Sequence, residues 1–317
     1  MTPKQSLICA MLRAGAGLAR GLLAAPLILF PLSGCARADS LQPIARFDWA
    51  TVSVTGLSGI EVASDGMAFH MVSDRGWVVT GRFERDAETI SGLVLDRIDP
   101  ILGIDGLPVS ARRLGDWSDA EGLAMAPDGT YWISFERWAR VAPYAPGGPD
   151  EGAGLPKAGW IRDHPDFATY ADNRQLEALA IAPDGTLYTF AEQPLAEGFA
   201  IYRLTDGTTW EVAGHIAPQD RFAIVGADFG PDGQLYLLER KLRLGLWWQN
   251  RFRRLSVDAP DQIETLWTGA PGAYGNLEGL ALWVRGAEIR AIAVSDTNGA
   301  PHEPTQFVEF RLIRDPS

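Results

Sequence analysis

The sequence predicts an all-β fold: a single β-propeller whose blades have four strands each, with five blades. Three observations lead to this prediction. A phrase built around a tight turn recurs five times, strand-like segments follow its copies, and helical periodicity is essentially absent beyond the N-terminal segment. Repeats of roughly 50 residues that contain four strands each are typical of propellers.

The recurring phrase is clearest in DAEGLAMAPDGTYWISFER at 119–137 and in QLEALAIAPDGTLYTFAEQ at 175–193. Looser copies lie at 225–241, 57–76 and 276–299. In each copy a short apolar run leads into a turn, and the turn is Asp-Gly in four of the five copies. An alternating run rich in aromatic and β-branched residues follows the turn. This order is typical of a β-hairpin. The equivalent positions of the five copies are Ser58, Glu121, Glu177, Val225 and Glu278, which are 63, 56, 48 and 53 residues apart. These spacings leave little room for a sixth blade, which is the alternative.

Further strand-like segments complete the blades, for example 200–205 and 210–216 in the third. The last hairpin is followed by only one more strand, at 306–313. We expect the strand around 43–49 to pair beside it, so that the two chain ends close the ring and leave no open edge. The Pro- and Gly-rich segment 141–175 predicts a long surface loop.

The first 34 residues predict an export signal. They contain Lys4, Arg13 and Arg20 but no acid, and they end in an apolar run of fourteen residues. That run is too short to span a bilayer, and a basic flank before a short apolar stretch is typical of a secretory signal.

The residues that follow predict a lipid anchor. Leu32-Ser33-Gly34-Cys35 matches a bacterial lipobox, in which Cys35 becomes the lipidated first residue; cleavage after Ala36-Arg37-Ala38 is the alternative. We expect residues 41–317 to form the propeller domain and to be exported. Cys35 would then hold it in the cell envelope, at the outer membrane facing the periplasm, by lipid chains that insert into the membrane.

Composition narrows the chemistry. The only cysteines are Cys9 and Cys35, so the body of the protein has no thiol catalysis, disulfide or cysteine-bound zinc. The net charge is -12, and removal of residues 1–34 makes it -15, which argues against binding to nucleic acid. No nucleophile elbow, H-E-x-x-H, P-loop or dinucleotide-binding motif is present in residues 35–317. We expect a monomer.

Acids stand at both ends of the repeated phrase. Residues equidistant from a hairpin turn face each other, which predicts that Glu121 faces Glu136 and that Glu177 faces Glu192. Since the first strand of each propeller blade lines the central channel, the open ends of all hairpins should converge on one mouth. The acids expected there are Asp74, Glu121, Glu136, Glu177, Glu192, Glu239, Glu278 and Asp296.

Carboxylates at this density repel one another unless a cation lies among them, and Ca²⁺ accepts six to eight oxygen ligands. We therefore predict a Ca²⁺ site. Its candidate ligands are Asp74, Glu136, Glu192, Glu239 and Asp296 at the mouth, with Glu61 and Asp228 deeper in the channel. These two deeper acids either ligate metal or only accept hydrogen bonds from backbone amides.

Three further acids, Glu121, Glu177 and Glu278, are candidates for the catalytic base. Basic residues next to the closing acids predict a rim that binds an anionic small molecule; they are Arg75, Arg137, Arg240 and Lys241. The alternative is a ring of salt bridges between blades that only seals the propeller.

With these segments taken together, the chain resembles the phytase-like β-propeller family, often described as having esterase-like activity, over about residues 50–313. The segments 57–76, 119–137, 176–192 and 277–299 carry the resemblance. It implies a propeller, export and calcium-assisted hydrolysis of phosphoesters. Two other functions are compatible with the residues: a lactonase-type hydrolase on the same scaffold, and a non-catalytic lipoprotein that binds a ligand or partner.

Overall fold

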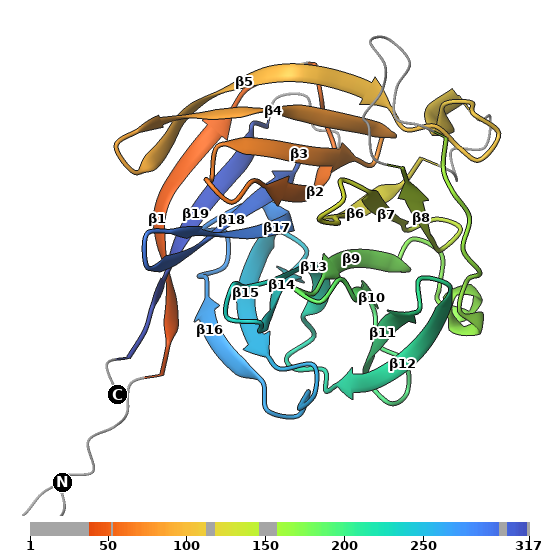
Figure 1. The fold of residues 1–317 in the computed structure, drawn as a ribbon. Coiled ribbons are helices and arrows are strands. Elements are labelled where there is room, and N and C mark those ends of the chain that lie inside the picture. The colour runs from red at the N-terminus through yellow and green to blue at the C-terminus, as the bar shows by residue number, and fades with distance from the viewer. Residues whose placement is uncertain (1–37, 52, 112–117, 146–156, 298–302, 316–317) are drawn as a thin grey trace, which may run out of the picture. The chain divides into compact units, whose positions relative to one another are not determined.

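The computed structural model describes residues 38–51, 53–111, 118–145, 157–297 and 303–315. Within them, five antiparallel sheets stand around a central channel, which confirms the predicted five-bladed propeller (Figure 1). The predicted signal segment and Cys35 lie outside the described residues. No helix among the described residues has the length and apolarity needed to cross a membrane, and only two short 3-10 helices occur there, η1 (Val109–Ala111) and η2 (Pro165–Thr169).

Each blade is a meander that runs from the channel outward. The first blade contains β2 (Leu57–Val62), β3 (Ala68–Ser73), β4 (Trp77–Asp86) and β5 (Thr89–Pro100). The second contains β6 (Ala120–Met125), β7 (Tyr131–Phe135) and β8 (Arg140–Tyr144), so it has three strands among the described residues where four were predicted. The third contains β9 (Leu176–Ile181), β10 (Leu187–Ala191), β11 (Phe199–Thr205) and β12 (Thr209–Ile216).

The last two blades include the closure of the ring. The fourth blade contains β13 (Ala223–Phe229), β14 (Leu235–Arg243), β15 (Trp247–Leu255) and β16 (Glu264–Thr268). The fifth contains β17 (Asn276–Arg285), β18 (Glu288–Asp296) and β19 (Thr305–Ile313), and its outermost strand is β1 (Ser40–Trp49) from the N-terminal side. The pairing of β1 with β19 confirms the predicted closure.

Asp-Gly turns hold the innermost hairpins. In the turn of the second blade, Gly129 has a φ of 87°, a left-handed conformation that glycine adopts without steric cost. The Asp128 side chain accepts a hydrogen bond from the Thr130 amide at 2.9 Å. The turns at Asp65, Asp184 and Asp232 are closed by the same contact to the amide two residues on. These aspartates are therefore committed to turn structure, at the end of the hairpins remote from the channel mouth.

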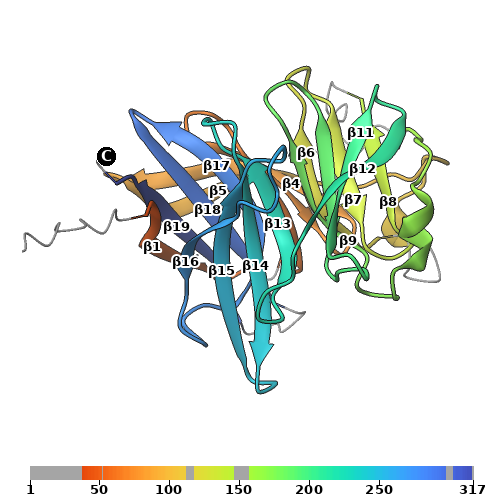
Figure 2. The ribbon, with the colours of Figure 1, turned by 90° about the horizontal axis from the view of Figure 1, so that it is seen from below.

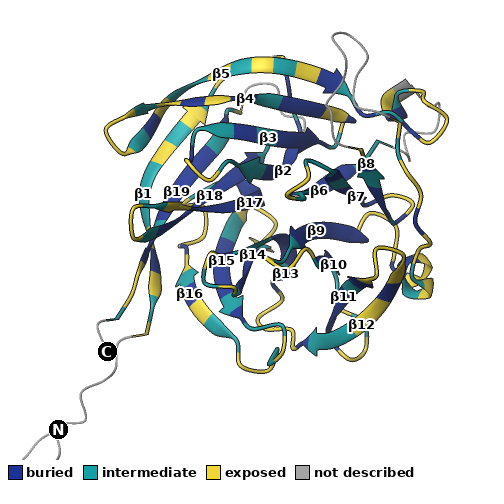
Figure 3. Cartoon of the chain, in the orientation of Figure 1, coloured by how far each residue is buried: buried dark blue, intermediate teal, exposed yellow. Residues whose placement is uncertain are grey.

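The hydrophobic core lies between neighbouring blades. Inner strands are almost wholly buried, whereas the outer strands and turns alternate or are exposed (Figure 3). Between the third and fourth blades, for example, Phe199 and Ile201 pack in one cluster with Leu235 and Leu237. Because every blade buries both faces in this way, the channel ends of the strands are held in fixed positions.

All five innermost strands carry a β-bulge at the same level. The bulged residues are Ser58, Glu121, Glu177, Val225 and Glu278. In four blades a glycine follows the bulge, because the next blade's backbone is too close for a side chain: a Cβ on Gly279 would lie 2.2 Å from the Ser58 carbonyl oxygen. The channel narrows here to a space of about 10 Å³, roughly the minimum that a single water needs.

Candidate functional site

A pocket of about 270 Å³ opens at the mouth of the channel, beside the bulges. It is termed the acid pocket here, because eight carboxylates from four blades line it together with two arginines. The lining residues are Ser58, Asp74, Asp119, Glu121, Glu136, Asn173, Arg174, Glu177, Glu192, Arg240, Glu278 and Asp296. The open ends of the hairpins therefore meet at one mouth.

The bulges determine which acids enter the pocket. A bulge leaves one residue out of the ladder and turns its side chain in a new direction. It also shifts the register, so the predicted pairing of Glu121 with Glu136 is wrong: the Glu136 amide donates instead to the Asp119 carbonyl at 2.8 Å. In the third blade the Glu192 amide likewise donates to Gln175, not to Glu177. Asp119 and Glu121 thus both reach the pocket.

The fourth blade contributes a cation where the others contribute an acid. Its closing position in the strand register is Arg240, which corresponds to Asp74, Glu136, Glu192 and Asp296 in the other blades. Counting eight residues from the Asp of the turn gives Glu136, Glu192 and Arg240, so the sequence contained this signal. Because strand neighbours point to opposite sides, Glu239 faces away from the pocket.

Glu239 is therefore not a metal ligand of the mouth, and that prediction is wrong. Its side chain is fully buried within the fourth blade. It accepts hydrogen bonds from Arg251 Nε at 2.5 Å and Arg253 Nε at 2.9 Å. Two arginines already saturate this carboxylate, which leaves no role for it as a ligand of a cation.

Arg240 organises one side of the pocket. It contacts Glu278, its Nη1 donates to Asn276 Oδ1 at 2.7 Å, and its Nη2 lies 3.4 Å from Glu192 Oε1 and 4.0 Å from Glu177 Oε1. Glu278 also accepts from the Ser58 hydroxyl at 3.3 Å. These contacts cross from the fourth blade to both neighbours, so the alternative of a sealing salt-bridge ring describes this half of the mouth.

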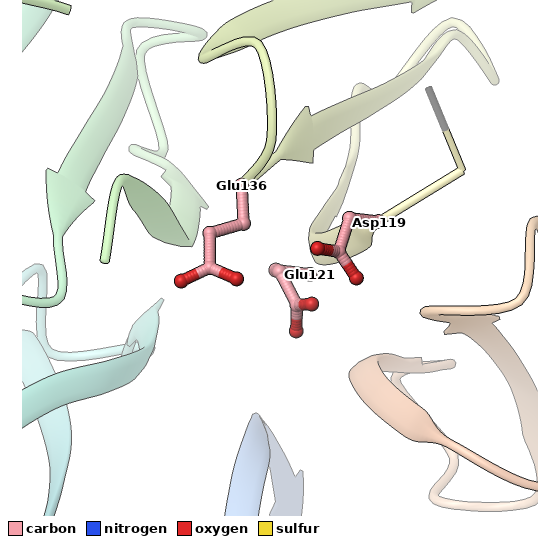
Figure 4. Close-up of side chains that lie close together, drawn as sticks. All are labelled: Asp119, Glu121 and Glu136. Carbon is pink, nitrogen blue, oxygen red and sulfur yellow. The ribbon is translucent and has the colours of Figure 1, made fainter. Parts of the chain in front are cut away.

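The opposite side of the pocket is poor in cations. Oxygens of Asp119, Glu121 and Glu136 lie within 4.8 Å of one another and point toward a common space (Figure 4). Asp119 is paired with Arg137 at 3.2 Å. Glu121 is only 8 % exposed and has no hydrogen-bond donor or cation among the described residues. A second group, Glu136, Glu177 and Glu192, satisfies the same spacing, and such groups could hold a metal ion.

Burial and mutual repulsion disfavour the charged forms of these acids. Burial raises the pKa of Glu121 well above its ordinary value, with further increases from Glu177, Asp119 and Glu136. Burial also raises the pKa of Glu177 well above its ordinary value, although Arg240 opposes the shift. The pKa values of Glu136 and Asp74 are raised to about 7, again first by burial. A cation bound among these groups would remove the penalty.

The two deeper acids lie beyond the narrow level of the channel. Glu61 accepts a hydrogen bond from the Met125 amide at 3.3 Å, and Asp228 accepts from the Leu282 amide at 2.6 Å. Each thus links its inner strand to that of the next blade. Neither lines the acid pocket, and the hydrogen bonds to backbone amides agree with one of their two predicted roles.

The remaining rim residues lie around the pocket and not in it. Arg75 is paired with Asp74 at 3.3 Å and Arg137 with Asp119, and both are largely exposed. Lys241 donates to the Asp220 carbonyl at 3.1 Å and lines a neighbouring groove. Sequence reasoning missed Asn173 and Arg174, which enter from the segment predicted as a surface loop.

Comparison with known proteins agrees with this architecture. A profile of a family described as "Phytase-like: Esterase-like activity of phytase" matches residues 52–299. The chain belongs to the phytase-like family. The acid pocket of this phytase-like protein has groups of carboxylates that could hold a metal ion. The comparison with curated proteins finds no match.

Solved structures share the propeller fold at low identity. An α-L-arabinofuranosidase from Podospora anserina, in complex with cellotriose, is 12 % identical, with a TM-score of 0.50 over 88 % of this chain and 98 % of that one. A putative gluconolactonase is 14 % identical with a TM-score of 0.47, covering 91 % and 97 %. A gluconolactonase from Xanthomonas campestris is 14 % identical with a TM-score of 0.42, covering 83 % and 88 %. These similarities concern the fold alone.

Proposed function

We propose that the acid pocket binds Ca²⁺ on its cation-poor side and that the protein hydrolyses anionic esters there. Phosphoesters are the substrate class that we expect first. The observation that carries the proposal is Glu121, a buried carboxylate to which no described residue donates a hydrogen bond and whose oxygens lie beside those of Asp119 and Glu136. Carboxylate oxygens are hard ligands of the kind that Ca²⁺ takes. If the acids of the mouth only formed salt bridges between blades, Glu121 would be expected to have a basic partner.

Residues of the acid pocket can bind the substrate and accept a proton. A bound divalent ion supplies charge that stabilises the ester oxygens and makes a nearby water more acidic. Arg240, held by Glu278 and Asn276, presents a guanidinium to the pocket and can bind an anionic group of the substrate. Glu177 lies between Arg240 and Glu136, where the nearby Arg240 guanidinium favours its charged form, in which it can accept a proton from water.

Calcium should stabilise the protein and support its activity. An ion that binds only the folded state at about a hundred times its Kd adds roughly 2.7 kcal/mol to the free energy of unfolding. Glu121→Gln keeps the shape and removes one charged ligand, so calcium affinity should fall by about tenfold or more while the metal-free protein stays folded. Calorimetric titration and calcium-dependent melting measure both effects, with Glu211→Gln, on the exposed surface of β12, as the matched control.

The calcium titration and an assay of the same protein on a panel of phosphoesters, other esters and lactones have three possible outcomes. Absence of calcium binding to the wild-type protein would overturn the metal site. Binding without turnover of phosphoesters or other esters would favour a ligand-binding protein. Turnover of lactones alone, in a panel that contains both substrate classes, would favour the lactonase-type alternative.

The metal-free protein should lose stability as pH rises. In the folded protein Asp74 and Glu136 have pKa values of about 7, against about 4 in an unfolded chain. Between pH 4 and pH 7 the folded state therefore binds more protons than the unfolded state. The contribution of these two carboxyl groups to stability is fully present below about pH 4 and is lost as the pH rises through 7. We expect the free energy of unfolding in chelator to fall between pH 5 and pH 8, by roughly 2–3 kcal/mol for each of the two groups, and calcium to restore it at pH 8.

Urea unfolding at several pH values tests this dependence. Glu136→Gln removes one of the titrating groups, so its chelated form should show a shallower decline with pH. A chelated wild-type protein whose stability rises over the same range would contradict the proposed charge state of the pocket.

We also propose that the protein is exported and anchored through lipid on Cys35, which rests on the lipobox alone. Cys35→Ala should move the protein from the membrane fraction to the soluble envelope fraction, as shown by fractionation and blotting. A wild-type protein that is already soluble there would favour cleavage after Ala38 instead.

A further inference from the structure

A groove runs from the acid pocket across the third and fourth blades. Its volume is about 920 Å³, and it shares Arg174, Glu192 and Arg240 with the acid pocket, so the two spaces adjoin. It is termed the side groove here. One wall is the β14–β15 hairpin, whose end projects beyond the neighbouring blades (Figure 2).

That wall presents apolar side chains to solvent. Leu242 is 48 % exposed and Leu244 is 83 % exposed, and both line the side groove together with Trp248. Leu244 has a φ of 53° and Gly245 a φ of 69°, in a turn closed by the Leu246 amide and the Arg243 carbonyl at 3.0 Å. The left-handed conformation is one that Asn, Asp and Gly adopt more readily than Leu. An exposed leucine in this conformation serves neither packing nor turn stability.

Cations stand beside the apolar wall. Arg221, Lys241 and Arg243 line the side groove, where the acids are Glu192 and Asp220. Lys241 Nζ lies 4.0 Å from the centre of the Phe222 ring, and Arg240 lies 5.3 Å from the centre of the Trp248 ring. The side groove therefore combines positive charge with aromatic and aliphatic surface, on a protein whose net charge is -12.

We propose that the side groove binds an anionic amphiphile, a molecule with an aryl or alkyl group next to a negative charge. The apolar group packs on Leu242, Leu244 and Trp248, and the charge is met by Lys241 and Arg243. Because the side groove adjoins the acid pocket at Arg240, the apolar group bound there is that of the ester substrate. That last step rests on the proposed function, whereas the binding itself does not.

Binding is tested without catalysis by 1-anilinonaphthalene-8-sulfonate, whose fluorescence rises in apolar surroundings. The wild-type protein should bind it in chelator as well as in calcium. Leu242→Asn combined with Leu244→Asn should weaken binding by about tenfold. Since Asn tolerates the left-handed conformation at position 244, this variant should melt at or above the wild-type temperature, so a loss of binding is not a loss of folding.

The matched control is Trp160→Ala, which removes another exposed aromatic residue, 71 % exposed and outside the side groove. It should leave the titration unchanged. Equal binding by the wild-type protein and the double asparagine variant would overturn the proposal. Binding to anionic phospholipid vesicles with no response to the free sulfonate would overturn it as well, in favour of a membrane contact of the hairpin.

Kinetics separate this inference from the proposed function. Hexyl phosphate and glycerol 1-phosphate have similar leaving groups but differ in apolar surface. The double asparagine variant should raise KM for hexyl phosphate several-fold and leave glycerol 1-phosphate unaffected. If neither ester is hydrolysed, the phosphoesterase assignment fails and the sulfonate titration still decides the side groove. An equal effect on both esters would overturn the link between the side groove and the substrate.

Discussion

Deletion of residues 41–50 should unfold the whole propeller and not only its fifth blade. The strand β1 pairs with β19 from Ser40 to Trp49. Leu41 is buried in the cluster between the fourth and fifth blades, and Trp49 packs on the cluster between the fifth and first. Loss of Leu41 alone costs about 1.5–3 kcal/mol, against a total stability of about 5–15 kcal/mol for a typical domain. The deletion also exposes the edge of β19, which should promote aggregation.

Thermal unfolding followed by circular dichroism measures the effect of the deletion. Arg46→Gln is the control, because it alters β1 only at an exposed ion pair with Asp48 and should change stability by less than about 1 kcal/mol. If the truncated protein has the same melting temperature as the full-length protein, β1 does not close the ring in solution.

Glu239→Gln should be among the most destabilising single substitutions. Glu239 and Arg253 are both fully buried and paired with each other, and Arg251 is nearly so. Loss of the carboxylate charge leaves buried guanidinium groups without compensation, which costs about 3–5 kcal/mol. Urea unfolding should show a lower midpoint with an unchanged slope.

Two comparisons isolate the cause of this loss. Glu211→Gln breaks an ion pair with Arg203 that is exposed, so its cost should stay below about 1 kcal/mol. Glu239→Leu combined with Arg251→Leu and Arg253→Leu removes all three buried charges and should recover much of the stability. If Glu239→Gln unfolds within about 1 kcal/mol of the wild type, the pair is not the buried network described here.

The propeller itself could be predicted from the sequence, because the repeated hairpin has its own local signals. Alternating residues and Asp-Gly turns such as Asp128-Gly129 specify each hairpin without reference to distant contacts. The closure by β1 could be inferred because the last blade lacked a strand.

The candidate site was predicted less completely. Mirror symmetry about the turn brought Glu121 and Glu136 to one mouth but gave the wrong register, since a bulge leaves no mark in the polar–apolar pattern. The register was off by two residues there, and a separate offset of one residue in the fourth blade assigned Glu239 to the pocket in place of Arg240. Asn173 and Arg174 come from an irregular segment, whose path depends on tertiary contacts that local patterns do not encode.

The level of the bulges separates the channel into two compartments. For the part of the chain that the structure describes, the space of about 10 Å³ there admits at most a single water. Glu61 and Asp228 on the inner side are thereby isolated from solutes that enter the acid pocket. The acid pocket is therefore closed toward the inner side of the channel, so a bound molecule larger than water must leave on the mouth side, where the side groove adjoins the pocket, before the next molecule can enter.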